Sequence, residues 1–311
     1  MNSGSGRRSC TRSIGEDRPK TASRACFGVV GRSEREPATS VTLRPMSRQK
    51  LGQHFLGDTG WRKRILGALN PKPNETWIEI GPGHGELTRH LARDGRRVIA
   101  IEADPVLAAE LNSAVATDSE EWQGVEIVTS DVLKADIGTI VGAGAESFRV
   151  YGSLPYYITS PILHHLFRWA ERIASIDIAI QLEVAERIAA GPGSRDYGYL
   201  STICQFYAHP KIAFRIPPGA FRPPPKVQSA LVKMTLPGES TALGVAEPEK
   251  FFGFLQMCFA QKRKTLRNNL LGASSDDRIH DALEKAGARN DARAEQLSLS
   301  QFATIFKSIS G

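Results

Sequence analysis

Residues 77–86 read Trp-Ile-Glu-Ile-Gly-Pro-Gly-His-Gly-Glu, an apolar run followed by closely spaced glycines. The pattern predicts a strand ending near Ile80 and a helix opening after Gly85, with glycines that let the backbone approach a ligand closely. A dinucleotide-binding loop needs its third glycine at position 86, where this chain has Glu86. A carboxylate at a helix N-terminus repels a pyrophosphate, so the loop favours a ligand without phosphate, for which S-adenosylmethionine is the obvious candidate.

Acidic residues follow the next two predicted strands. Glu102 closes the second strand, where a carboxylate can bind ribose hydroxyls, and Asp131 follows the third, where it can accept a hydrogen bond from an adenine amine. Either acid alone is more often a surface residue or a helix cap. Because ligands of open α/β sheets bind at the carboxyl ends of the strands, their shared location favours one cofactor site.

Short apolar runs alternate with helical patterns from Trp77 onward. We expect strands over Trp77–Ile80, Val98–Ile101, Val125–Val128, Phe148–Gly152 and Ile176–Leu182, with helices near Leu87–Arg93, Val106–Ala116 and Ile162–Ile173. This alternation predicts an α/β fold with a doubly wound, mostly parallel Rossmann-like sheet. Helical patterns then cover Phe251–Ala260, Ile279–Ala286 and a segment around Phe302–Ile309. We therefore expect a main domain over residues 46–240 and a smaller C-terminal helical domain over residues 241–311.

The first 45 residues differ from the rest in composition. They are rich in Arg, Ser and Gly and carry five of the seven net positive charges of the chain, so the overall charge says little about nucleic-acid binding. We expect this extension to be disordered. It could be an organelle transit segment or a basic RNA-binding arm, but we favour a translation start at Met46, because ordered sequence begins immediately after it.

Composition places the chain among globular proteins of a reducing compartment. Its 41% apolar content is enough for a core, and no apolar run approaches the roughly 20 residues that span a bilayer. The four cysteines, Cys10, Cys26, Cys204 and Cys258, have neither paired nor metal-like spacing. We expect a cytoplasmic protein without a membrane segment, disulfide framework or metal site.

Residues 153–156, Ser-Leu-Pro-Tyr, follow the predicted strand Phe148–Gly152. Such a tetrad alone is most often a strand-to-helix turn. Here its parts also suit a flat base with an amino group: Ser153 Oγ and the Leu154 carbonyl can accept the amine hydrogens, Pro155 is rigid, and Tyr156 can stack on the base. Drawing the hydrogens out of plane makes the delocalised amine of adenine a better nucleophile.

With these motifs read in order, the chain from about Arg48 onward resembles the small-subunit ribosomal RNA adenine N6,N6-dimethyltransferase family. The resemblance rests on Gly52-Gln53-His54-Phe55-Leu56, the glycine loop, the 153–156 tetrad, and Phe221-Arg222-Pro223-Pro224-Pro225-Lys226-Val227. It implies direct transfer of methyl groups from S-adenosylmethionine to adenines near the 3′ end of small-subunit rRNA, in an assembling ribosomal particle. We expect the enzyme to act as a monomer.

The resemblance also implies roles for individual residues. Cofactor contacts fall on His54, Leu56, Gly81, Glu102, Asp131 and Ser153, and substrate contacts on Ser153, Leu154, Pro155, Tyr156 and Phe221. Tyr156 and Phe221 would sandwich the adenine after it leaves its stack. The family usually has Asn at the positions of His54 and Ser153; a serine hydroxyl keeps an acceptor oxygen but reaches less far than an amide.

A basic run, Gln261–Arg267, follows the predicted helix Phe251–Ala260. Such runs are often solvated helix faces. Beside an adenine-binding pocket we assign Lys262, Arg263, Lys264 and Arg267 to phosphate contacts, which position RNA without reading its sequence.

Three other functions fit parts of the pattern. A large-subunit rRNA dimethylase shares the cofactor and base motifs, but the run Gln261–Leu270 favours the small subunit. A non-catalytic nucleic-acid-binding relative is disfavoured by the intact glycine loop, although Ser153 leaves it open. Glu86 argues against a nicotinamide dehydrogenase.

Overall fold

The computed structural model describes residues 54–155 and 157–310, all within one compact unit, Met46–Gly311. The expectations for residues 1–45, Gly52, Gln53 and Tyr156 lie outside the described residues.

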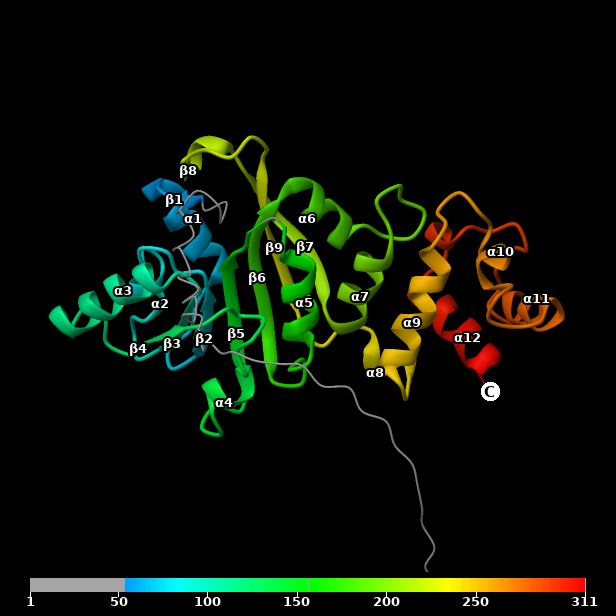
Figure 1. The fold of residues 1–311 in the computed structure, drawn as a ribbon, viewed down its shortest axis with the longest axis horizontal. Coiled ribbons are helices and arrows are strands. Elements are labelled where there is room, and N and C mark those ends of the chain that lie inside the picture. The colour runs from blue at the N-terminus through cyan, green and yellow to red at the C-terminus, as the bar shows by residue number, and fades with distance from the viewer. Residues whose placement is uncertain (1–53, 156, 311) are drawn as a thin grey trace, which may run out of the picture. The chain divides into compact units, whose positions relative to one another are not determined.

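A seven-stranded sheet forms the centre of the described chain (Figure 1). Its order is β4 (Val125–Thr129), β3 (Arg97–Glu102), β2 (Thr76–Ile80), β5 (Phe148–Ser153), β6 (Ile173–Gln181), β9 (Ser229–Thr235) and β7 (His209–Ile216). The first five strands are parallel, and β9 is antiparallel to both neighbours. The chain direction across the sheet reverses between β2 and β5, which creates a crevice at their carboxyl ends.

Helices connect the strands, as the alternating pattern predicts. They are α1 (Thr59–Leu69), α2 (Thr88–Leu91), α3 (Pro105–Thr117), α4 (Ile137–Val141), α5 (Thr159–Phe167), α6 (Leu182–Ala189) and α7 (Tyr199–Tyr207). Local sequence sets their starts: Asp104 Oδ1 accepts from the Val106 N–H at 2.9 Å, with Pro105 in the first turn of α3. The expected α/β class with a mostly parallel sheet is confirmed.

Several expected boundaries were wrong. The helix expected over Ile162–Ile173 ends at Phe167, and Ile173 already begins β6. The helix after the glycine loop covers only Thr88–Leu91, and turns precede it. The antiparallel strands β7 and β9 were not expected at all.

The C-terminal helices lie together beside α7 (Figure 1). They are α8 (Ser240–Leu243), α9 (Pro248–Phe259), α10 (Leu266–Leu270), α11 (Asp276–Lys285) and α12 (Leu299–Ser310), with a short 3₁₀ helix at Ala294–Gln296. Phe206 of α7 packs against Phe251 and Phe252 of α9, with ring centroids 5.9 and 5.2 Å apart. The helices thus share one hydrophobic core with the sheet. The division at residue 240 stays a prediction.

Two distant segments pair beside the sheet. The short strands β1 (Phe55–Leu56) and β8 (Phe221–Arg222) run antiparallel, after a 3₁₀ turn at Pro218–Ala220. In the described part of the chain, no helix has the length and apolar character to cross a bilayer. Cys204 and Cys258 are buried free thiols there, and burial raises the pKa of both.

Candidate active site

One cavity of about 450 Å³ opens at the carboxyl ends of β2, β3 and β5. This is the crevice expected to bind ligands in a sheet of this order. Every described residue predicted for the cofactor or the target base lines it: His54, Leu56, Gly81, Glu102, Asp131, Ser153, Leu154, Pro155 and Phe221. The structure therefore brings together residues that are up to 167 positions apart in the sequence.

The loop after β2 can be built only with glycine at its key positions. Gly81, Gly83 and Gly85 have φ of +67°, +60° and +75°, in the left-handed region. A Cβ on Gly83 would lie 2.7 Å from the Phe55 ring, and one on Gly85 would lie 2.3 Å from Trp122. The backbone thus forms the cavity wall without side chains in the way.

Glu102 joins this loop to the end of β3. Its side chain is buried, Oε2 accepts a hydrogen bond from the Gly83 N–H at 3.2 Å, and Oε1 accepts one from the Asp104 N–H at 2.9 Å. Burial raises the pKa of Glu102, although the backbone donors oppose the shift. The carboxylate is therefore fixed at the wall of the cavity.

Glu79 is a second acid in the cavity wall, and sequence reasoning missed it. It lies in β2, is only 2% exposed, and its Oε2 has no hydrogen-bond partner among residues 54–155 and 157–310. Burial raises its pKa to about 7; the nearby Thr88 hydroxyl opposes this shift, and the Glu102 carboxylate adds to it. The sequence feature that could have revealed Glu79 is its place as a carboxylate inside the apolar run Trp77–Ile80.

Residues 153–155 leave the end of β5 in a fixed geometry. The Leu154 side chain is buried in the core, its N–H donates to the Ala179 carbonyl at 3.1 Å, and the Pro155 carbonyl accepts from the Ile158 N–H at 3.3 Å. Within the described chain, neither Ser153 Oγ nor the Leu154 carbonyl makes a hydrogen bond. Both oxygens remain able to accept from a ligand.

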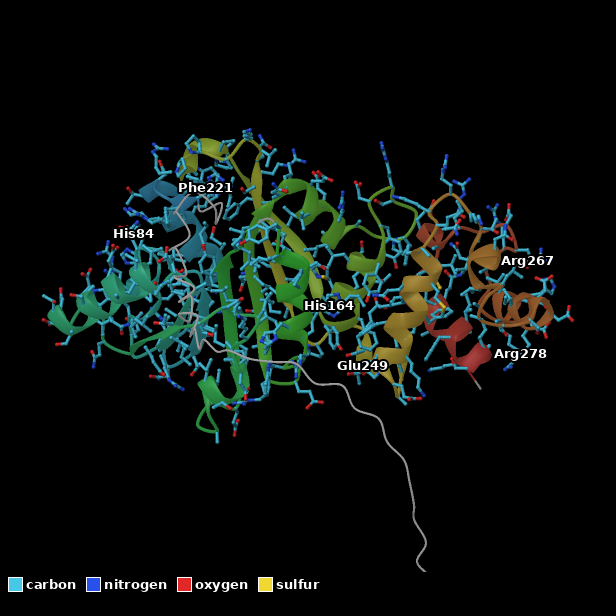
Figure 2. The ribbon with its side chains drawn as sticks, viewed as in Figure 1. His84, His164, Phe221, Glu249, Arg267 and Arg278 are labelled. Atoms are coloured by element: carbon cyan, nitrogen blue, oxygen red, sulfur yellow. The ribbon has the colours of Figure 1, made fainter. Side chains whose placement is uncertain are left out.

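The pairing of β1 with β8 joins the predicted cofactor and substrate residues. Leu56 is in register with Phe221, and the N–H groups of Gly57 and Asp58 both donate to the Ala220 carbonyl, at 3.0 and 3.2 Å. His54 Nδ1 lies 2.8 Å from the Pro223 carbonyl, so this nitrogen donates. Phe221, the first residue of β8, is buried and is labelled in Figure 2.

A family model described as ribosomal RNA adenine dimethylase matches residues 45–310, a range that includes every described residue. The chain belongs to the ribosomal RNA adenine dimethylase family.

Curated relatives agree with this family. The chain is 40% identical over 283 residues to the "Ribosomal RNA small subunit methyltransferase A" of Koribacter versatilis, covering 88% of the chain and 98% of the relative. The protein of the same name in Acidobacterium capsulatum is 43% identical over 261 residues, covering 84% of the chain and 90% of the relative.

Solved structures share the methyltransferase fold. The 23S rRNA methyltransferase ErmE has a TM-score of 0.64 at 26% identity, covering 83% of this chain and 100% of its own. A dimethyladenosine transferase from Plasmodium falciparum has a TM-score of 0.69 at 24% identity, covering 81% and 96%, and supports the fold alone.

Most of the basic run lies outside the helices. Lys262, Arg263 and Lys264 are exposed and lie in the turn between α9 and α10. The Lys262 ammonium donates to the Arg195 carbonyl at 2.6 Å, and Arg267 forms an ion pair with Asp276. Figure 2 shows Arg267 among the C-terminal helices, and its role in RNA contact stays a prediction.

Glu86, which was expected to repel a pyrophosphate, is not an isolated negative charge. Its carboxylate forms ion pairs with Arg62 of α1 and with Arg89, the second at 3.4 Å. The expected repulsion of a pyrophosphate is therefore weakened by paired cations. Arg64 is also engaged, because its guanidinium lies over the rings of Trp61 and Phe214 at 4.9 and 4.5 Å.

Proposed function

We propose that this protein transfers methyl groups from S-adenosylmethionine to N6 of adenines in small-subunit rRNA, twice on each base. One observation carries the proposal: a single cavity joins the glycine loop and the strand-end acids to Ser153, Leu154 and Phe221. A cofactor and a target base can therefore meet inside it.

The cavity wall has the donor and acceptor groups that the cofactor needs. The positive-φ glycines leave space that a Cβ would fill. The buried Glu79 Oε2 can accept a hydrogen bond from a donor such as an ammonium group. His54, Leu56 and Gly81 would hold the methionine part, Glu102 the ribose and Asp131 the adenine amine. Asp131 Oδ1 accepts from the Leu133 N–H at 3.0 Å, which fixes its carboxylate. The bound cofactor supplies an electrophilic methyl group on a sulfonium.

The residues at the end of β5 activate and position the amine. Ser153 Oγ and the Leu154 carbonyl accept the two N6 hydrogens and draw them out of the ring plane, so the nitrogen becomes more pyramidal and its lone pair is less delocalised into the ring. Pro155, Tyr156 and Phe221 hold the base, which must leave its stack to enter. A cofactor held by the glycine loop and Glu102 would supply the methyl group, whose bond to sulfur would break as the bond to N6 forms, and the proton released from N6 would pass to solvent. Catalysis therefore rests on positioning and polarisation, without a protein nucleophile.

RNA recognition would depend on shape and on phosphate contacts. Lys262, Arg263, Lys264 and Arg267 are proposed to contact phosphates of the rRNA, near its 3′ end, in an assembling ribosomal particle. We propose that the enzyme acts in the cytoplasm as a monomer.

The decisive experiment measures transfer of labelled methyl groups to small ribosomal subunits that lack adenine dimethylation. Large subunits without methylated adenines are the matched substrate control. Dimethyladenine in small subunits alone is the expected result. Incorporation only into large subunits would instead favour an activity like that named for ErmE. Binding of cofactor and RNA without any transfer would favour a non-catalytic relative.

Ser153 is tested in the same assay. Ser153→Ala removes an acceptor and should lower the transfer rate by about a hundredfold, while Ser153→Asn keeps an acceptor oxygen and should remain active. Cofactor affinity, measured by calorimetry, reports whether each variant still has an intact site. Equal rates in Ser153→Ala and the wild type would remove Ser153 from the reaction.

A further inference from the structure

Tyr157 lines the cavity and is also largely exposed to solvent. The residue is 66% exposed. The other large apolar side chains with high exposure in the described chain are Val106, Val227, Met257 and Leu271. Within that set only Tyr157 is aromatic, and only Tyr157 lines the cavity.

The backbone on both sides of Tyr157 is held firmly. Leu154 is buried, Ile158 packs against the main core, and the Pro155 carbonyl accepts from the Ile158 N–H and from Thr159 Oγ1 at 3.3 and 3.5 Å. The Tyr157 ring itself makes no hydrogen bond or ring contact with any described residue. Tyr157 therefore presents an aromatic ring to solvent, although such rings are normally buried for their large apolar area.

We propose that Tyr157 stacks on the nucleotide next to the target adenine, and so helps to determine which sequence context is methylated. This inference rests on the proposed function. Phe221 is only 2% exposed and lines the cavity where a base would meet it, whereas Tyr157 lines the cavity and is largely open to solvent. When the target base enters the cavity, its neighbour loses a stacking partner outside it. Unstacked RNA bases are commonly held on aromatic rings, which can replace that partner.

Tyr157→Ala removes the ring, and Tyr157→Phe keeps it without the hydroxyl. Steady-state transfer to unmethylated small subunits should show a KM for the subunits raised about tenfold in Tyr157→Ala and nearly unchanged in Tyr157→Phe. Cofactor affinity by calorimetry should be the same in both. Leu271→Ala, which trims another exposed apolar side chain away from the cavity, should match the wild type. A KM in Tyr157→Ala equal to that of the wild type would overturn the inference.

The stacking partner is identified with small subunits reconstituted from rRNA that has an abasic nucleotide on one side of the methylated adenines. At one of the two sides, the abasic substitution should raise the wild-type KM about tenfold and leave the KM of Tyr157→Ala unchanged. Equal increases in both proteins at both sides would contradict stacking by Tyr157. Failure of the proposed function is distinguishable, because the wild type would then transfer no methyl groups to intact unmethylated subunits.

Discussion

The Glu79 carboxyl is the most strongly perturbed acid in the cavity wall. Its pKa is raised from 4.5 to about 7, chiefly by burial. Between these values the folded protein binds more protons at Glu79 than the unfolded chain does. The free energy of unfolding therefore falls as the pH rises through this window, and the loss is complete above the folded pKa.

Glu79→Gln should remove this contribution. As the pH rises from about 5 to about 8, the wild type should lose about 3 kcal/mol of free energy of unfolding relative to the variant, because Gln stays neutral. Urea denaturation of the cofactor-free proteins measures the difference. Glu284→Gln, an exposed acid on α11, is the control and should follow the wild-type pH dependence. If the difference in free energy of unfolding between Glu79→Gln and the wild type did not change with pH, Glu79 would not have the raised pKa.

Much of the candidate site could be predicted residue by residue. Gly81, Glu102, Asp131 and Ser153 follow predicted strands, and parallel strands bring their carboxyl ends to one edge. Glu79 was missed because an acid that alternates with apolar residues along a strand normally faces water. The structure shows that both faces of β2 are covered. Tyr157 was missed because exposure cannot be read from the turn sequence.

At the scale of elements, the glycine loop supports the β1–β8 pair through Phe55. Gly83→Ala should displace the Phe55 ring, which a Cβ would approach to 2.7 Å, and weaken cofactor binding at least tenfold. Gly142→Ala is the matched control, since Gly142 also has positive φ, +73°, but a Cβ there meets nothing within 4 Å.

Both variants force alanine to a positive φ, so each should lose about 1–3 kcal/mol of stability. Calorimetric titration of the cofactor then separates the two effects. Equal cofactor affinities in the two variants would mean that Phe55 does not shape the site.

The parallel half of the sheet followed from the sequence, but its antiparallel edge did not. Strands β2 to β6 alternate with helices, which is the pattern of βαβ units. In β9, Ser229–Met234 is almost wholly buried, a short apolar run that periodicity alone does not distinguish from a helical segment. In β7, Pro210 weakened the strand pattern; the structure places this strand at the sheet edge, where proline is tolerated.

At the scale of the whole molecule, the exposed cations after α9 are candidates for a phosphate contact far along the chain from the cavity residues. A Lys262/Arg263/Lys264 triple alanine should reduce the slope of log affinity for rRNA against log salt by about 2. Filter binding at several salt concentrations gives the slope.

A second triple alanine, at Arg278, Lys285 and Arg293, removes the same charge from other exposed C-terminal positions. It should leave the slope near the wild-type value. Identical reductions in the two variants would mean that only net charge matters. Arg267→Ala should change the slope by less than one third of the change in the first triple variant, because Asp276 already holds Arg267.

The register of Leu56 with Phe221 makes one two-stranded ribbon a shared support for both halves of the site. A bound cofactor should therefore raise the affinity for the target base. Thermodynamic reciprocity then requires that a bound base raise the affinity for the cofactor by the same factor. Two successive transfers need an exchange of spent cofactor for fresh. During that exchange the hold on the RNA should be at its weakest, so singly methylated adenine should escape more often when cofactor is scarce.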